Sequence, residues 1–357
     1  MKKIYAMAAL ALHFFAFAQD GAPAQPYYGS FNFTSQSGMT LKNALATLVT
    51  NKHTNNLTYS QVWDALKNTD LDPSNSNNVL LVYGWENGSD SNLTNDRSRN
   101  KNSNGGNNGE WNREHTYAQA LGNPDLGQTG PGADAHHLRA SDVQRNNTRG
   151  NLKYAAGSGV ASGASNGGWY PGDEWKGDVA RMMMYMYLRY GDQCLPTVIG
   201  IGNSVQSDQD MIDLFLQWNA DDPVSPYEDN RNTYLGSTTN TYRQGNRNPF
   251  IDNPYLATLI WGGPVAQNRW PSLGTADFAW VSTVTVYPNP AHDRINISSD
   301  RDLQDIEVIS VNGQVVRHID HPTFSNQEFT IENLPNGFYL IKLSTGEQSI
   351  VKKVIVN

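Results

Sequence analysis

The pattern of apolar residues changes near residue 283, and this change constrains the fold more than any other feature of the chain. Several earlier segments repeat apolar residues at helical spacing, whereas from Val284 onward only short alternating runs remain. Turn signals of the Asn-Gly or Thr-Gly type separate these runs at 312–313, 336–337 and 345–346. The length of 357 residues also suits two domains. We therefore predict a small antiparallel β-sandwich over 284–357, joined by a linker over 273–283 to a separate domain.

The C-terminal region also resembles a known module. Its predicted strands cover residues 295–297, 306–310, 314–317, 329–331, 338–343 and 350–356. The segments VYPNP at 286–290, NGQ at 312–314 and LPNGFY at 334–339 resemble the C-terminal sorting domain of the Bacteroidetes type IX secretion system. This resemblance implies export by the type IX secretion machinery, followed by surface attachment or release. The alternative is a carbohydrate-binding or adhesive β-module, but the row of exposed aromatic residues usual in such modules is sparse here.

The N-terminus has the pattern of a secretory signal over residues 1–18. Lys2 and Lys3 precede a mostly apolar stretch, and small residues at Ala16 and Ala18 suit cleavage after Ala18. The apolar stretch is too short to cross a bilayer comfortably, so we expect a secreted protein with no stable membrane span. Residues 19–39 are rich in Gly, Pro and Ser and are expected to form a loose leader. Because the chain has one cysteine, Cys194, a core or bound ions must stabilise it in place of disulfides.

Between the two ends, helical spacing predominates. Apolar spacing predicts helices over 41–49, 58–66, 178–190 and 211–218, a strand over 79–83 and a final apolar segment over 255–261. Ser60 is expected to cap the second helix, and Asp222 to cap the turn after residue 221. The segment 178–190 is apolar all round and is expected to be a core helix. Residues 87–108 form a polar loop of unknown role.

Two short stretches contain the residue types that phosphodiester hydrolysis needs. The first is WNREHTY at 111–117, where Glu114 can supply a carboxylate ligand for a hard cation and His115 can act as a general base. Adjacent strand residues point to opposite faces, so both can serve one site only where the strand ends or bends.

The second stretch is DAHHLR at 134–139, continuing to 151. Residues 137–139 are expected to form a strand, and Ser141 to cap a helix with Asp142 in its first turn. On that helix Asn146 and Arg149 share a face, so an amide ligand and a guanidinium would meet one phosphate.

Simpler readings of the same residues stay open at this point. His136 and His137 could be zinc ligands, although no further ligand follows at a suitable spacing. His137 could equally be a buried, hydrogen-bonded histidine, and Arg139 and Arg145 could lie on a solvated face. The methionine cluster in 178–190 could suggest copper, but no Cys or His accompanies it.

Taken together, the motifs resemble the endonuclease I family of secreted bacterial nucleases. They are NREH at 112–115, DxHHL at 134–138, and Asn146 with Arg149 and Asn151; the segments 60–63, 176–181 and 245–252 agree with the family in order. The resemblance covers residues 40–262, within a domain that we place at 40–272. It implies an α+β fold: a mainly helical nuclease domain with an embedded ββα-metal core, followed by the all-β sandwich.

The resemblance also implies site residues. Glu114 and Asn146 would hold the divalent ion, His115 would activate water, and residues 134–138 would support the core. Arg149 would contact phosphate. Some relatives carry several disulfides or a Trp-Pro soon after the histidine, where this chain has Tyr117-Ala118, so loop geometry does not transfer in detail.

The leading hypothesis is a secreted, divalent-metal-dependent endonuclease. Mg²⁺ is the expected cofactor, with Ca²⁺ or Mn²⁺ as alternatives, and the expected partners are DNA and RNA without sequence preference, cleaved to 5′-phosphate products. We expect a monomer. One alternative is a surface adhesin or binding module with a degenerate nuclease fold. Another is a phosphodiesterase that acts on a substrate other than nucleic acid.

The net charge of −8 by itself argues against a polyanionic partner. Its distribution removes this objection, because residues 97–153 hold 8 basic and 5 acidic residues while residues 208–229 hold 7 acidic residues and no basic one. The acidity therefore lies largely outside the candidate catalytic stretch.

Overall fold

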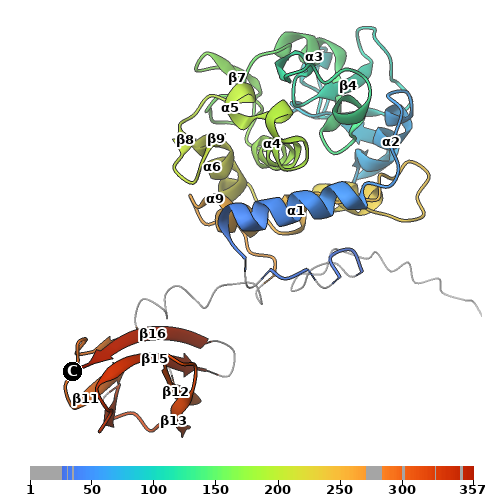
Figure 1. Ribbon diagram of the computed structural model, residues 1–357. Helices are drawn as coiled ribbons and strands as arrows, with labels where there is room; N and C mark the ends of the chain where they lie inside the picture. Colours follow the sequence, from blue (N-terminus) through green and yellow to red (C-terminus); the bar gives the residue numbers. More distant parts are fainter. Residues whose placement is uncertain are drawn as a thin grey trace, which may run out of the picture. The chain divides into compact units, whose positions relative to one another are not determined.

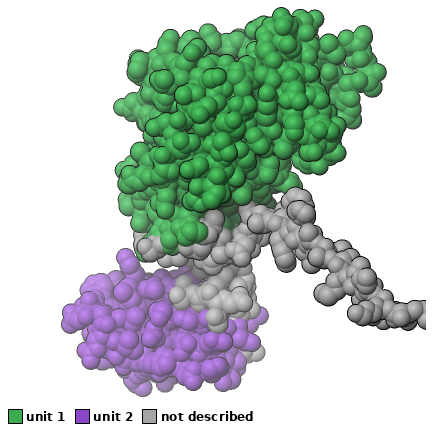
Figure 2. All heavy atoms as spheres, turned by 90° about the vertical axis from the view of Figure 1, so that its right-hand side faces the viewer, with its two compact units in different colours: residues 1–271 green, residues 272–357 purple. Residues whose placement is uncertain are grey.

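The computed structural model describes residues 26–29, 31–33, 36–270, 284–299, 302–325, 327–345 and 349–357. The chain divides into two compact units, residues 1–271 (unit 1) and 272–357 (unit 2), as Figures 1 and 2 show. The signal segment expected at 1–18 and the linker expected at 273–283 lie outside the described residues. Among the helices that the structure describes, none has the length and apolar character needed to cross a bilayer.

Unit 1 consists mainly of helices, with short strands between them. The α-helices are α1 (Gly38–Lys52), α2 (Gln61–Thr69), α3 (Val143–Arg149), α4 (Lys176–Tyr190), α5 (Pro196–Ile199), α6 (Asp213–Asp221), α7 (Pro226–Leu235), α8 (Pro249–Asp252) and α9 (Tyr255–Trp261). The 3-10 turns are η1 (Leu93–Asn95), η2 (Gln119–Leu121), η3 (Gly130–Ala133) and η4 (Gly191–Cys194). The strands are β1 (Leu71–Asp72), β2 (Asn75–Leu80), β3 (Ser98–Asn100), β4 (Trp111–His115), β5 (Leu138–Asp142), β6 (Gly163–Ser165), β7 (Gly168–Tyr170), β8 (Ser204–Val205) and β9 (Asp208–Ile212).

Helix α4 is the central helix of unit 1. Its residues from Gly177 to Leu188 are all buried, and α1, α5, α6 and α8 pack against it. Figure 1 shows α4 nearly end-on, with α1 running across the unit beside it. The prediction of a core helix over 178–190 is confirmed. Its methionines are core side chains, in keeping with a helix that is buried on every face.

Several predicted boundaries and caps are wrong, and each error has a local cause. The cap of α2 is Thr58, whose hydroxyl accepts from the Gln61 amide, rather than Ser60, which already has helical dihedrals. Ser225 caps α7 in a reciprocal capping box with Glu228. Asp222, expected in that role, instead accepts a hydrogen bond from the Gly177 amide at the start of α4.

Other differences arise from strand pairing. The strand expected at 79–83 ends at Leu80, and the helix expected at 211–218 begins at Asp213, because the residues before it form β9 and pair with β8. The polar stretch 87–108 contains η1 and β3, and β3 completes a sheet of order β1-β2-β3.

Part of the expected loose leader is packed, since Tyr28 and Phe33 are buried against Trp270.

Strands β4 and β5 form an antiparallel hairpin that leads directly into α3. Trp111 pairs with Asp142, and His115 pairs with Leu138. Asp142 rather than Ser141 caps α3, because its carboxylate accepts hydrogen bonds from the Gln144 and Arg145 amides, each at 2.9 Å. The hairpin therefore places the two candidate catalytic stretches side by side, with α3 immediately after them.

Unit 2 is a sandwich of two antiparallel sheets. One sheet has the order β10-β11-β14 and the other β13-β12-β15-β16. The strands are β10 (Thr285–Tyr287), β11 (Arg294–Ser298), β12 (Asp305–Ser310), β13 (Val315–Asp320), β14 (Glu328–Glu332), β15 (Gly337–Ser344) and β16 (Ser349–Val356). Residues of both sheets, such as Ile295 and Ile341, share one buried core. Every strand predicted in this region is present.

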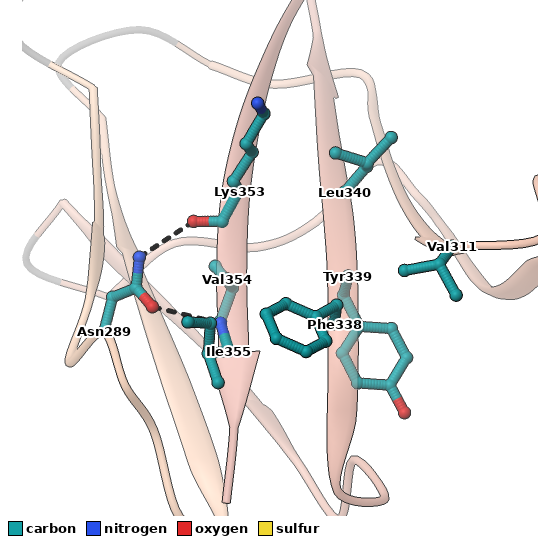
Figure 3. Close-up of a pocket in the computed structure, with 8 residues that line it drawn as sticks. All are labelled: Asn289, Val311, Phe338, Tyr339, Leu340, Lys353, Val354 and Ile355. Carbon is teal, nitrogen blue, oxygen red and sulfur yellow. Dashed lines mark hydrogen bonds between the residues drawn. The ribbon is translucent and has the colours of Figure 1, made fainter.

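The edge strand β16 is closed by residues of the VYPNP segment. Figure 3 shows the Asn289 side chain donating from Nδ2 to the Lys353 carbonyl at 2.9 Å and accepting at Oδ1 from the Ile355 amide at 3.0 Å. Because these bonds occupy main-chain groups of an edge strand, they protect it from pairing with another chain. Beside them lies an apolar depression of about 340 Å³ that includes Phe338 and Val311.

Candidate active site

A polar cleft of about 370 Å³ opens between the end of β4 and the second half of α3. The candidate residues Glu114, His115, Asn146 and Arg149 all line it. Glu114 and His115 are the last two residues of β4, as the strand-end argument predicted. The expectation that Asn146 and Arg149 share a face of α3 is also confirmed. The remaining lining residues are mostly polar or small: Tyr59, Arg113, Ala118, Gln119, Ala120, Asn147, Gly150 and Asn151.

Glu114 is a buried carboxylate, with a relative exposure of 3%. Its Oε1 accepts a hydrogen bond from the Tyr83 hydroxyl at 2.9 Å and lies 3.3 Å from Nη1 of Arg149. Burial raises the pKa of Glu114 to about 7, against the opposing effects of Arg149 and Tyr83. The carboxylate therefore lacks full compensation for its charge, as expected for a group that binds a cation.

His115 is held as a neutral imidazole with a defined tautomer. Its Nε2 lies 2.9 Å from the carbonyl oxygen of Gly132, and a carbonyl can only accept. Nε2 therefore carries the proton, and Nδ1 keeps the lone pair that a base requires. Burial, assisted by His137, lowers the pKa of His115 to about 3, so the ring is uncharged at neutral pH.

Asn146 has its amide oriented by a neighbouring asparagine. Nδ2 of Asn146 donates to Oδ1 of Asn112 at 2.8 Å, which leaves Oδ1 of Asn146 as an acceptor at the cleft. Asn112 and Glu114 are two residues apart on β4 and so face the same side of the strand. One strand face therefore holds the candidate carboxylate ligand and the residue that orients the candidate amide ligand.

Arg149 is engaged mainly with the protein itself. Its guanidinium has a relative exposure near 1% and donates to the carbonyls of His115 at 3.0 Å and Thr116 at 2.9 Å, besides contacting Glu114. These contacts fix the end of β4 and place a positive charge next to the carboxylate. The predicted phosphate contact of Arg149 stays a prediction.

The segment 134–138 lies behind the cleft and supports it. Asp134 accepts hydrogen bonds from the hydroxyls of Tyr185 and Tyr190, both at 2.8 Å, and pairs with Arg189. His136 and His137 direct Nε2 at the main-chain oxygens of Asn246 and Pro131. Among the described residues, no three His, Cys, Asp or Glu side chains gather as a metal cluster, so the structure gives no support to the zinc alternative.

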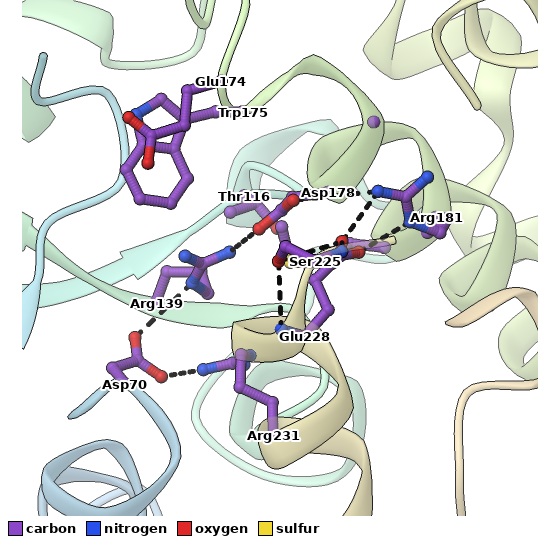
Figure 4. Close-up of polar contacts among 12 residues, drawn as sticks. Asp70, Thr116, Arg139, Glu174, Trp175, Asp178, Arg181, Ser225, Glu228 and Arg231 are labelled. Carbon is purple, nitrogen blue, oxygen red and sulfur yellow. Dashed lines mark hydrogen bonds and ion pairs between the residues drawn. The ribbon is translucent and has the colours of Figure 1, made fainter. Parts of the chain in front are cut away.

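Buried ion pairs hold strand β5 from its other side (Figure 4). Arg139 of β5 lies between Asp70 at 3.5 Å and Asp178 at 3.0 Å, and Asp70 also pairs with Arg231. The Asp70 carboxylate accepts from the Ala140 amide of β5 at 2.8 Å as well. Arg139 is thus fully buried and paired, and the reading that placed it on a solvated face is wrong.

Sequence reasoning missed residues that contact the candidate side chains from distant segments. Tyr83, which bonds Glu114, adopts a left-handed backbone with φ of +76°, a conformation that costs free energy for a tyrosine. Gly132 brings its carbonyl to His115 in a turn so tight that a Cβ there would collide with the Gly127 carbonyl. Tyr59 stacks on His115 with ring centroids 5.4 Å apart. No local motif marks these three residues.

Acid should remove a measurable part of the stability through Asp134. Burial raises the pKa of Asp134, but Arg189, His136 and His53 outweigh it, and the net pKa lies well below the usual value. The ionised carboxylate thus stabilises the fold above the unfolded-state pKa of about 3.9, and this contribution is lost as the pH falls below that value. Below pH ~4, the free energy of unfolding should fall more steeply in wild type than in Asp134→Asn, by up to about 1.4 kcal/mol per pH unit. Chemical denaturation between pH 2 and 6 tests this, and parallel curves would contradict it.

Comparisons with known proteins identify the family of each unit. Residues 37–255 match the model of the family described as Endonuclease I, and residues 285–357 match that of the secretion system C-terminal sorting domain. An extracellular ribonuclease of Bacillus subtilis (strain 168) is 42% identical over 255 residues, which cover 67% of this chain and 82% of the relative. The extracellular ribonuclease of Bacillus amyloliquefaciens is 42% identical over 250 residues, or 67% of this chain and 79% of the relative.

A solved structure of PorZ, a surface component of the type-IX secretion system of Porphyromonas gingivalis, aligns with a TM-score of 0.20 at 16% identity. The alignment covers 24% of this chain and 13% of that one, too little to bear on the fold. The family matches span both units, and the relatives are extracellular enzymes. The chain is therefore a secreted nuclease that belongs to the endonuclease I family and carries a secretion-system C-terminal sorting domain.

Proposed function

We propose that this enzyme hydrolyses phosphodiester bonds of DNA and RNA without sequence preference, with a divalent cation, and leaves 5′-phosphate products. The observation that carries the proposal is the meeting of Glu114, His115 and Asn146 in one open polar cleft. The two relatives are both extracellular ribonucleases, which supports RNA as one substrate. A cleft built around a carboxylate, an amide and a histidine reads the backbone rather than the bases, which favours low sequence preference.

The residues present fit a hard divalent cation. Mg²⁺ takes oxygen ligands and keeps several waters, so one carboxylate and one amide oxygen suffice to hold it. Glu114 offers a buried, undercompensated carboxylate, and Asn146 offers an oriented amide oxygen at the same cleft. We therefore assign Glu114 and Asn146 as the residues that would hold Mg²⁺, with Ca²⁺ or Mn²⁺ as alternatives. When bound, the cation would stabilise negative charge that develops on the phosphate during hydrolysis.

His115 acts in this proposal as the general base. Its Nδ1 takes a proton from the attacking water. The Gly132 carbonyl accepts a hydrogen bond from the Nε2–H group and so stabilises the imidazolium that forms. The Tyr59 ring and the Gly132 carbonyl hold the imidazole in one orientation before substrate arrives. Arg149 keeps the carboxylate of Glu114 in place, and a phosphate contact of Arg149 is part of the proposal. In this proposal, β4, β5 and α3 form the ββα-metal core that the family resemblance implies.

The C-terminal unit has a proposed role in secretion of the enzyme. Unit 2 is proposed to engage the type IX secretion machinery, as the sorting-domain match suggests. We also propose that the enzyme works as a monomer, because one chain supplies every residue of the cleft. Light scattering coupled to gel filtration checks the oligomeric state.

Chelation of the metal should abolish cleavage. Plasmid DNA and a structured RNA are incubated with the full-length mature protein, with EDTA or with excess Mg²⁺, Mn²⁺ or Ca²⁺. We expect EDTA to slow nicking by at least about 10³-fold, because a catalytic metal contributes several kcal/mol to the transition state. Addition of metal in excess of EDTA should restore the rate. Gel electrophoresis measures the cleavage.

A substitution at Glu114 separates loss of the metal site from other causes of inactivity. Glu114→Gln keeps the size of the side chain but removes the charge, so it should lose both cleavage and the rise in Tm that added Mn²⁺ gives the wild type. Nicking in EDTA at the wild-type rate would contradict metal dependence. Nucleic-acid binding without any cleavage would favour the binding-module alternative. Turnover of a small phosphodiester beside inert DNA and RNA would favour the non-nucleic phosphodiesterase.

A further inference from the structure

A second arginine lines the cleft, and no carboxylate among the described residues pairs with it. Two arginines, Arg113 and Arg149, line the cleft, and Arg149 is paired with Glu114 and almost wholly buried. Arg113 is half-buried, and no ion pair among the described residues includes it. Its positive charge is therefore uncompensated at the place where a polyanionic substrate would enter.

Aromatic side chains hold the Arg113 guanidinium in place. The guanidinium carbon lies 3.5 Å from the ring centroid of Tyr59 and 4.4 Å from that of Trp63. Nη1 also donates a hydrogen bond to the Tyr59 carbonyl. A stacked guanidinium loses little entropy when it binds an anion, and its planar fork suits two phosphate oxygens. An arginine held this way is prepared for phosphate in a manner that a lysine would not be.

The position of Arg113 on β4 places it beside the reacting group. Arg113 and His115 are two residues apart and so lie on one face of the strand, about 6.8 Å apart along it. The Tyr59 ring contacts both, with Arg113 at 3.5 Å and the His115 ring centroid at 5.4 Å. A phosphate next to the bond that the His115-activated water would cleave is therefore within reach of the guanidinium.

We propose that Arg113 binds a backbone phosphate of the nucleic-acid substrate next to the scissile bond. This inference rests on the proposed function of the cleft and adds the residue that recognises the substrate charge. Arg149, by contrast, uses both of its Nη atoms for hydrogen bonds to Glu114 and to main-chain carbonyls. The interaction is made in the bound ground state as well as in the transition state, so it lowers KM more than it raises kcat.

Binding measured against salt concentration tests the proposal directly. The Kd of a fluorescent DNA duplex is measured by anisotropy in EDTA, from 50 to 300 mM NaCl, with full-length wild type, Arg113→Ala and Arg113→Lys. Loss of one phosphate contact should weaken binding about 10-fold at low salt and reduce the slope of log Kd against log salt by about 0.9. Arg113→Lys should keep the slope, because it keeps the charge, and bind more weakly than wild type.

Arg145 supplies a matched control. It too is a stacked arginine outside any described ion pair, with its guanidinium 4.6 Å from the Trp85 centroid and Nε donating to Thr94 at 3.0 Å. It does not line the cleft. Arg145→Ala should therefore leave the salt slope unchanged. A slope change equal to that of Arg113→Ala would show a general charge effect and overturn the proposal.

Kinetics separates phosphate binding from an indirect effect through Tyr59. With Mg²⁺ present, Arg113→Ala should raise KM about 10-fold with little change in kcat, whereas a displaced His115 would lower kcat instead. If Arg113→Ala unfolds below 37 °C, Arg113→Gln, which keeps the stacked stem, replaces it.

The outcomes distinguish this inference from the proposed function. An unchanged salt slope, or a loss confined to kcat, overturns the inference even when wild type cleaves DNA. If wild type cleaves nothing with any metal, the proposed function fails. If cleavage continues in EDTA, metal dependence fails, and Kd cannot be measured on a substrate that is being cut. The dependence on salt is then measured for kcat/KM in place of Kd.

Discussion

His115→Ala should lower kcat for plasmid nicking by about 10³-fold while leaving DNA binding close to wild type. The reason is that a positioned general base contributes roughly 10²- to 10⁴-fold to the rate. Nδ1 of His115 carries the lone pair, and the low pKa keeps the ring neutral throughout the physiological range. Initial rates of supercoiled plasmid conversion, measured with saturating Mg²⁺, give the effect.

Two controls make this experiment specific for base catalysis. His318, in unit 2, has a side chain 53% exposed, and His318→Ala should nick at the wild-type rate. Added imidazole should partly restore the activity of His115→Ala, because the substitution leaves a space of that shape; a merely structural role gives no such rescue. Cleavage by His115→Ala at the wild-type rate would refute the assigned mechanism.

Asp70→Ala should lower the free energy of unfolding of unit 1 by about 3–5 kcal/mol. Asp70 is fully buried, and its carboxylate faces Arg139 and Arg231. Removing one partner of a buried ion pair leaves uncompensated charge behind, which costs more than the pair itself contributes. Here the loss would leave both guanidinium groups without this partner and free the Ala140 amide of β5.

The measurement reports mainly on unit 1, because eight of the nine tryptophans lie within residues 1–271 and only Trp280 lies outside them. Denaturant unfolding is therefore followed by tryptophan fluorescence. Glu174→Ala is the matched control, because it breaks an exposed ion pair with Arg97. The side chains of Glu174 and Arg97 are 38% and 33% exposed, so the substitution should lower the free energy of unfolding by less than about 1 kcal/mol. Equal losses for the two variants would contradict the importance we assign to burial (Figure 4).

The candidate site shows how far local pattern reaches. Glu114 and His115 can meet at one cleft only where a strand stops, and β4 stops at His115. Asn146 and Arg149 follow from helical spacing within a single helix, α3. These predictions succeed because each depends on the geometry of one short element.

Errors occurred where several residues compete for one local role. Asp142 caps α3, although Ser141 and Asp142 are both competent caps in sequence. Only the register of the hairpin, which pairs Trp111 with Asp142, decides which of the two ends the strand. At α7, Ser225 accepts from the Glu228 amide, whereas Asp222 accepts from the Gly177 amide of a distant helix, α4.

Local sequence patterns were enough to predict a mainly helical region followed by a β-sandwich, and the position of the candidate catalytic stretches. They were enough because hydrophobic period and residue spacing act over a few neighbouring residues. Long-range packing, in contrast, fixes the Tyr83–Glu114 bond, the tautomer of His115 set by Gly132, and the burial of Arg149 beside a half-buried Arg113 in the cleft wall. Those outcomes depend on packing between segments far apart in the chain, where burial and hydrogen-bond geometry, rather than residue type, assign each charge its partner.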